Sequence, residues 1–122
     1  MEEFALSVIK IHDILMVTVP PEPDDDTISM LQERVLKSMD QYAAKGLILD
    51  ISTVQTLDSF FARTIVETGQ MVKLMGGITV IAGMQPSVAI TAVQLGLTFE
   101  GILTSLDVER AMESINNEKA GG

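Results

Sequence analysis

The sequence predicts a single α/β domain with a mixed, mostly parallel sheet and the element order ββαβαβαβα. Two short β-rich runs near the start, separated by two polar residues, are typical of a leading β-hairpin. After them, short apolar runs alternate with amphipathic segments of helix length, a pattern that indicates parallel strands joined by right-handed helical crossovers. No repeat, linker or shift in composition divides the 122 residues, so we expect one domain over residues 1–122.

The hairpin is predicted at residues 6–11 and 14–19, with His12 and Asp13 in the turn. Three closely spaced prolines then end the second strand, because proline cannot donate a hydrogen bond to a sheet. The first helix should begin at residues 24–27, where a capping side chain and acidic groups suit the positive end of the helix dipole. Its core face is marked by apolar residues at steps of three and four, which are Ile28, Leu31, Val35, Met39 and Tyr42.

The first helix should end near Lys45 and Gly46, a cation and a glycine in the usual terminal positions. Strands at residues 47–51 and 78–82 follow, separated by a polar turn and a second helix at about residues 59–75. Both strands lack polar alternation, so we expect them to be central parallel strands that helices cover on both faces.

The last third of the chain predicts one more helix, strand and helix. Pro86 opens the third helix near its first turn, and Gly96 ends it. A short strand is predicted at residues 102–103, and residues 104–107 resemble a capping box for the final helix. That helix should bury Val108, Ala111, Met112 and Ile115. The tail, residues 116–122, is expected to fray.

Composition argues against several kinds of partner and several kinds of site. A net charge of −9, from 17 acidic and 8 basic residues, disfavours nucleic acid and anionic membranes and suits a basic protein partner. The absence of cysteine excludes disulfides and thiolate metal sites. Residues 76–99 carry no charge, but the Gln-Pro-Ser sequence in their middle favours a strand, a turn and a helix over a membrane span. The start of the chain lacks a signal-peptide pattern, so a cytoplasmic protein is expected.

Constellations typical of enzymes are missing, and we expect no catalytic activity, no metal and no cofactor. The one histidine, His12, is interpreted as a solvated turn residue. Gly76 and Gly77 stand at a helix end and not in a phosphate-binding loop. The acidic run at residues 24–26 lacks the alternating ligands and the closing glutamate of a calcium loop.

Residues 50–63 are the segment of most functional interest, because a buried strand there leads through a short polar loop into a helix. On physical grounds Ser59 is expected to cap that helix, an interaction worth about 1 kcal/mol. The apolar strand, the polar loop and the Asp58-Ser59 pair at a helix start also resemble the signature of STAS domains, the family of anti-anti-sigma factors. The resemblance covers essentially the whole chain. It implies that Ser59 is phosphorylated, with Asp58 and Phe60 as its neighbours in the switch loop.

The residues after Ser59 depart from the commonest pattern of that family, in which a small residue and a glycine follow the serine. Here Phe60, Phe61 and Ala62 follow, which is similar to the small single-domain scaffold proteins of stressosomes. That resemblance implies a scaffold that sequesters a serine/threonine kinase of the anti-sigma type and releases it on phosphorylation, upstream of a sigma factor or another output. It also implies a scaffold paralogue with a sensor domain, a protein phosphatase and an oligomeric assembly. The alternatives are a simple anti-anti-sigma factor that binds an anti-sigma kinase directly, and a STAS domain that binds a nucleotide or lipid.

One face of the second helix suggests an interface. At about 100° per residue, the face opposite the predicted core face collects Phe60, Thr64, Glu67, Met71 and Leu74. Three of these side chains are large and apolar, which indicates either a protein interface or a covering by neighbouring loops. If they are exposed, they place Ser59 at the rim of that interface.

Overall fold

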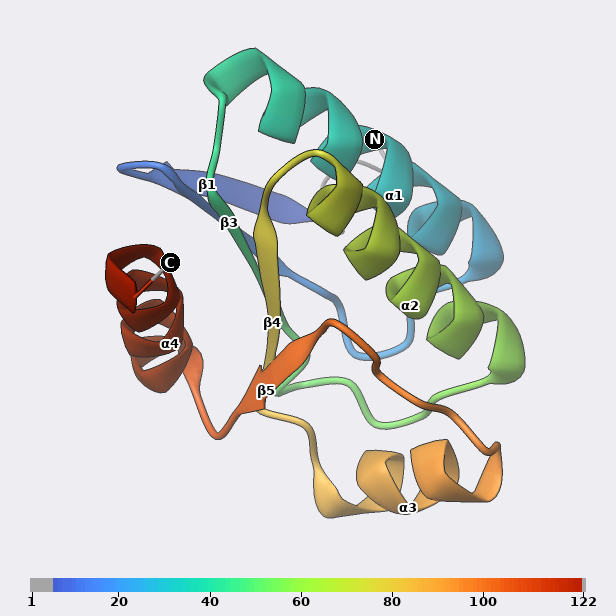
Figure 1. Ribbon diagram of the computed structural model, residues 1–122. Coiled ribbons are helices and arrows are strands. Elements are labelled where there is room, and N and C mark those ends of the chain that lie inside the picture. The colour runs from blue at the N-terminus through green and yellow to red at the C-terminus, as the bar shows by residue number, and fades with distance from the viewer. Residues whose placement is uncertain (1–5, 122) are drawn as a thin grey trace.

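The computed structural model describes residues 6–121 and has its helices and strands in the predicted order (Figure 1). The strands are β1 (Ser7–Ile11), β2 (Ile14–Thr18), β3 (Gly46–Asp50), β4 (Ile78–Ala82) and β5 (Leu103–Ser105). The helices are α1 (Asp25–Tyr42), α2 (Ser59–Leu74), α3 (Pro86–Gln94) and α4 (Val108–Gly121). The predicted α/β class and the ββαβαβαβα order are therefore confirmed.

The five strands form one sheet in the order β1-β2-β3-β4-β5. Only β1 and β2 are antiparallel, and the pairs β2–β3, β3–β4 and β4–β5 are parallel. As predicted, β3 and β4 are internal strands, and Leu47, Ile48 and Leu49 of β3 are fully buried. An internal strand needs apolar residues at successive positions because both of its faces are covered.

Helices cover the two faces of the sheet unequally (Figure 1). α1 and α2 lie side by side on one face, where most of the buried apolar side chains form a single cluster that includes Leu47 and Leu49. α4 lies alone on the other face, where a smaller cluster includes Ile48 and Ile115. α3 lies beyond the end of the sheet and contributes Val88 to the larger cluster.

The end of α1 differs from the prediction. The helix ends at Tyr42, and Ala43, not Gly46, adopts the left-handed conformation at its C-cap, with φ 49°. Gly46 instead begins β3 on the face that α4 covers, where a Cβ atom would lie 2.8 Å from the Ile115 side chain. The glycine is therefore required for the close approach of α4 to the sheet and not for ending a helix.

The predicted capping box at residues 104–107 is also wrong. Thr104 and Ser105 belong to β5, where they pair with Ile81 and Ala82 of β4. Asp107 itself precedes α4, and its Oδ1 accepts a hydrogen bond from the Arg110 amide at 2.8 Å. Because Thr104 and Ser105 pair with β4, neither can cap α4, and Asp107 is the residue that caps it.

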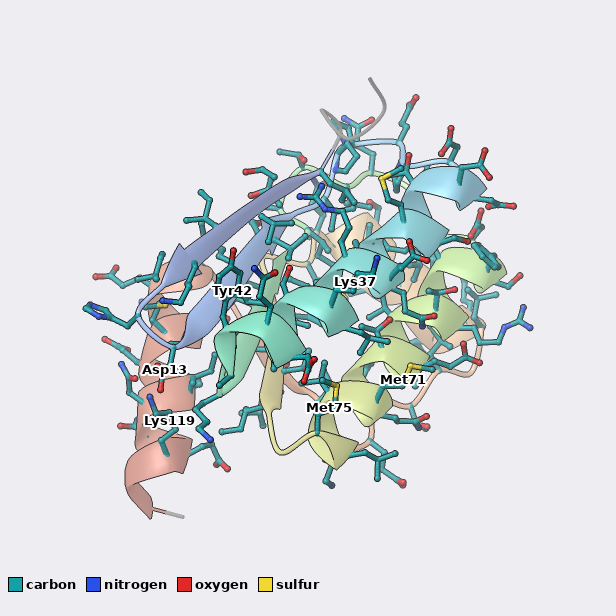
Figure 2. The ribbon with its side chains drawn as sticks, turned by 90° about the horizontal axis from the view of Figure 1, so that it is seen from above. Asp13, Lys37, Tyr42, Met71, Met75 and Lys119 are labelled. Atoms are coloured by element: carbon teal, nitrogen blue, oxygen red, sulfur yellow. The ribbon has the colours of Figure 1, made fainter. Side chains whose placement is uncertain are left out.

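α4 continues to Gly121 and so includes most of the tail, residues 116–122, for which fraying is predicted. Near its end the Lys119 ammonium donates a hydrogen bond of 2.6 Å to the Asp13 carboxylate in the β1–β2 turn, as Figure 2 shows. This hydrogen bond lowers the pKa of Asp13 below its ordinary value. Residues 6–121 contain no helix of the length and apolarity that a bilayer crossing requires.

Gly69 in the middle of α2 provides a test of the packing between this helix and the chain before β5. A Cβ atom at Gly69 would lie 2.6 Å from Ile102 Cγ1 and closer still to Cδ1. Gly69→Ala should therefore lower the free energy of unfolding by about 1–3 kcal/mol through overpacking. At an exposed helix position the same substitution would instead stabilise the helix, by about 1 kcal/mol. Urea unfolding measures the change.

Ile102→Ala supplies the control background for this test. In that background Gly69→Ala should lose most of its penalty, because the clashing atoms are absent. Stabilisation by Gly69→Ala in the otherwise unchanged chain would contradict the described packing.

Candidate functional site

The loop between β3 and α2 lies at the carboxyl end of the parallel strands and is tied to the sheet at several points. The Ile51 amide donates to the Ala82 carbonyl at 3.0 Å, and the Ser52 amide donates to Asp50 Oδ1 at 3.0 Å. The Gln85 side chain donates to the Ser52 carbonyl at 2.7 Å, which joins this loop to the start of α3. The loop that leads into α2 is thus hydrogen-bonded both to β4 and to the residue before α3.

Asp58, and not Ser59, caps α2. The Asp58 backbone is extended, with φ −102° and ψ 174°, and its Oδ1 accepts a hydrogen bond of 2.8 Å from the Phe61 amide. Ser59 is the first helical residue, so its side chain no longer occupies the capping position. The expected capping role of Ser59 is therefore wrong, and the carboxylate one position earlier performs it.

The Ser59 side chain is exposed, and within residues 6–121 its hydroxyl has no hydrogen bond in the structure. Arg63, four residues later and therefore one turn along α2, is exposed as well. Arg63 is not among the predicted site residues, although its spacing from Ser59 is visible in the sequence. An anion on Ser59 would thus have helix amides beside it and a guanidinium within reach of the same helix face.

The predicted interface on α2 is only partly exposed. Thr64 is 7% exposed and Phe60 is half-buried against the larger core cluster, because α1 packs along this side of α2. Gln32 of α1 donates a hydrogen bond of 3.0 Å to Thr68 Oγ1, which itself donates to the Thr64 carbonyl at 2.7 Å. The five side chains therefore form no continuous surface. The element that covers part of them is the helix α1, and not a neighbouring loop as one alternative predicted.

The exposed remainder of that face is Glu67, Met71 and Leu74, and Leu74 is 89% exposed. Leu74 is 15 residues beyond Ser59, which corresponds to about 22 Å along a helix. Met71 and Met75 lie at the end of the molecule where α1 ends at Tyr42 (Figure 2). The exposed apolar part of this face therefore lies at the end of α2 that is far from Ser59, and an interface role for these residues stays a prediction.

The other acidic and histidine residues have structural positions. The helix start predicted at residues 24–27 is confirmed, and Asp24 is the cap: its Oδ1 accepts from the Thr27 amide at 2.8 Å, and this hydrogen bond lowers the pKa of Asp24. His12 is exposed in the hairpin turn with φ 55°. The described part of the chain contains no group of three or more His, Cys, Asp or Glu side chains that could hold a metal ion.

Comparisons with known proteins agree on one family. A family model described as STAS domain matches residues 5–111. The chain is 31% identical over 111 residues to the RsbT co-antagonist protein RsbRD of Bacillus subtilis (strain 168), covering 90% of this chain and 40% of that protein. It is similar in structure to a variant of RsbS of Moorella thermoacetica, with a TM-score of 0.84 and 29% identity over 94% of this chain and 97% of that one.

A chain from a structure of the stressosome, described as a signal integration and transduction hub, is also similar. Its TM-score is 0.77, with 27% identity over 93% of this chain and 98% of that one. Against the first curated relatives the chain is short, because it spans only 34% and 33% of their lengths. The similarity to those relatives therefore concerns one part of each of them.

The assignment of the cap to Asp58 can be tested by substitution. Asp58→Ala should lower the free energy of unfolding by about 0.5–2 kcal/mol, the usual cost of losing an N-cap. Ser59→Ala should change it by no more than about 0.5 kcal/mol, as is usual for an exposed residue without a special role. Asp58→Asn is the matched control, because asparagine caps equally well without the charge. If urea unfolding shows that Ser59→Ala lowers the free energy of unfolding more than Asp58→Ala does, Ser59 and not Asp58 is the cap.

Proposed function

Because the chain belongs to the STAS domain family, we propose that it is a cytoplasmic, non-enzymatic scaffold of a stressosome, switched by phosphorylation of Ser59. In this function it sequesters a serine/threonine kinase of the anti-sigma type and releases that kinase when Ser59 carries a phosphate. Its other partners are a scaffold paralogue with a sensor domain and a protein phosphatase. Similarity to RsbS and to a stressosome chain, each over more than nine-tenths of both chains, supports the scaffold assignment.

The proposal is supported above all by one observation: Asp58 caps α2, while the neighbouring Ser59 is exposed. Asp58 accepts the hydrogen bond that a helix start needs, so the fold does not depend on the serine hydroxyl. Ser59 is left exposed at the first position of a helix, on a loop that is tied to the sheet. A kinase can therefore reach the hydroxyl without local unfolding.

A phosphate at this position changes the surface more than the fold. It adds about −1.5 to −2 charges and three acceptor oxygens, and the amides at the start of α2 tolerate an anion there. Asp58 and the phosphate together make the start of α2 strongly negative, while Arg63 can pair with part of that charge. The phosphate thus alters the surface with which the unphosphorylated chain binds the kinase, while the domain stays folded.

Phosphorylation by the cognate kinase tests the proposal directly. Incubation with the kinase and ATP should place phosphate on Ser59, and Ser59→Ala should remove most of the incorporation. Ser87→Ala is the matched control, because Ser87 is also exposed in the first turn of a helix, α3. Phosphopeptide mapping identifies the modified residue.

Kinase binding should respond to the same modification. Surface plasmon resonance should show at least a roughly tenfold weaker affinity of the kinase for the phosphorylated chain than for the unmodified chain, because the phosphate changes the shape and charge of the surface that the kinase contacts. Modification of Ser52, Thr56 or Ser87 with Ser59 untouched, or equal affinity of the two forms, would contradict the proposed switch.

A further inference from the structure

Ser59 and Arg63 share one side of α2, and α1 covers another. Both residues are exposed, and at about 100° per residue they stand about 40° apart around the helix. Each lies about 140° or more from Thr68, which α1 contacts through a hydrogen bond from Gln32. A group attached to Ser59 is therefore beside Arg63 and on a different side of α2 from α1.

The guanidinium of Arg63 is available to a new anion. Within residues 6–121 the structure shows no ion pair of Arg63. Asp58 stands five residues before it, about 140° around the helix, and the Asp58 carboxylate already accepts a hydrogen bond from a helix amide. Glu67 stands four residues after it, but a helix pair is weaker when the base precedes the acid than in the reverse order. The favourable order places the anion at Ser59.

The start of α4 contains an ion pair of the same kind. Arg110 Nη1 lies 2.6 Å from Oδ2 of Asp107, the residue three positions earlier that caps this helix. Side chains of a helix lean toward its N-terminus, so a basic residue one turn into the helix reaches an acidic group at its start. In α2 the basic residue has the spacing that suits Ser59 and not the spacing that suits the cap.

We propose that Arg63 is the internal partner of the phosphate on Ser59, so that the phosphorylated form is held by an ion pair within α2. This inference rests on the proposed phosphorylation of Ser59 and specifies how the chain receives it. A phosphate offers three acceptor oxygens, and a guanidinium can donate to two of them through parallel hydrogen bonds.

The ion pair changes what the start of α2 presents to a partner. Arg63 is the only basic residue between Lys45 and Lys73. Without the phosphate its positive charge is exposed beside the Ser59 hydroxyl. With the phosphate the same charge is engaged inside the helix, so one modification both adds an anion and removes a cation from the surface open to a partner.

Phosphorus NMR of the full chain, with phosphoserine incorporated at residue 59 during translation, tests the ion pair without a kinase. The titration gives the pKa of the second phosphate proton, ordinarily about 6. A nearby cation favours the dianion and so lowers this pKa. In Arg63→Gln the pKa should be higher by at least about 0.2, the effect expected of an exposed helix pair. Arg63→Lys should give an intermediate value, because lysine keeps the charge but lacks the planar fork.

The chain offers a matched control for the cation and another for the phosphate. Lys73→Gln removes the other basic residue of α2, which is about 21 Å along the helix from Ser59, and should leave the pKa unchanged. Phosphoserine at residue 87 also lies in the first turn of a helix, but Thr91 stands four residues after it. Arg63→Gln should not change the pKa of that phosphate. Circular dichroism should show the same fold for all variants.

A phosphoserine 59 whose pKa is the same with and without the Arg63→Gln substitution overturns the inference, and so does an equal shift on Lys73→Gln. The outcome is separable from that of the proposed function. If the kinase modifies Ser59 but the pKa does not respond to Arg63→Gln, the inference alone fails. If the pKa responds but the kinase leaves Ser59 unmodified, the proposed function fails and the ion pair is supported.

Discussion

The burial of β3 on both faces is the constraint on which the rest of the structure depends. Leu47 and Leu49 face α1 and α2, and Ile48 between them faces α4. A strand with apolar side chains in both directions requires a neighbour on each edge and a helical layer on each face. The crossovers that satisfy this requirement bring the carboxyl ends of four parallel strands to one end of the sheet. The loop before Ser59 and the turn before α3 both start from that end, so the starts of α2 and α3 lie at the same end of the sheet.

At the start of α2, the residue that caps the helix and the proposed phosphorylation site are two different side chains. Asp58 holds the Phe61 amide, and the loop before it is bonded to β4 and to Gln85. The adjacent serine is therefore free to change its chemical state without a cost to the helix. A serine that capped the helix would couple phosphorylation to the loss of a stabilising hydrogen bond, of the order of 1 kcal/mol. With Asp58 as the cap, the proposed phosphorylation of Ser59 would not remove that hydrogen bond.

The two ends of the domain carry different kinds of apolar surface. At one end, Met71, Leu74, Met75 and Tyr42 are exposed around the ends of α1 and α2 (Figure 2). At the other, Ile90 and Val93 of α3 are exposed, α3 itself has no ionisable side chain, and a groove lies beside it.

Local pattern by itself determined the class of the fold, the order of the elements, the two internal strands and the start of the first helix at residues 24–27, because hydrophobic period, proline and glycine positions and capping chemistry act over a few residues. It also located the Asp58-Ser59 pair at a helix start. Only the tertiary structure decided which of the two caps the helix, that Thr64 lies under α1, and that Gly46 admits Ile115 of α4. The physical reason is that each of these depends on a neighbour distant in the sequence or on a backbone conformation that packing selects. The period of a helix shows which residues share a face, but the elements packed around it determine whether that face meets protein or water.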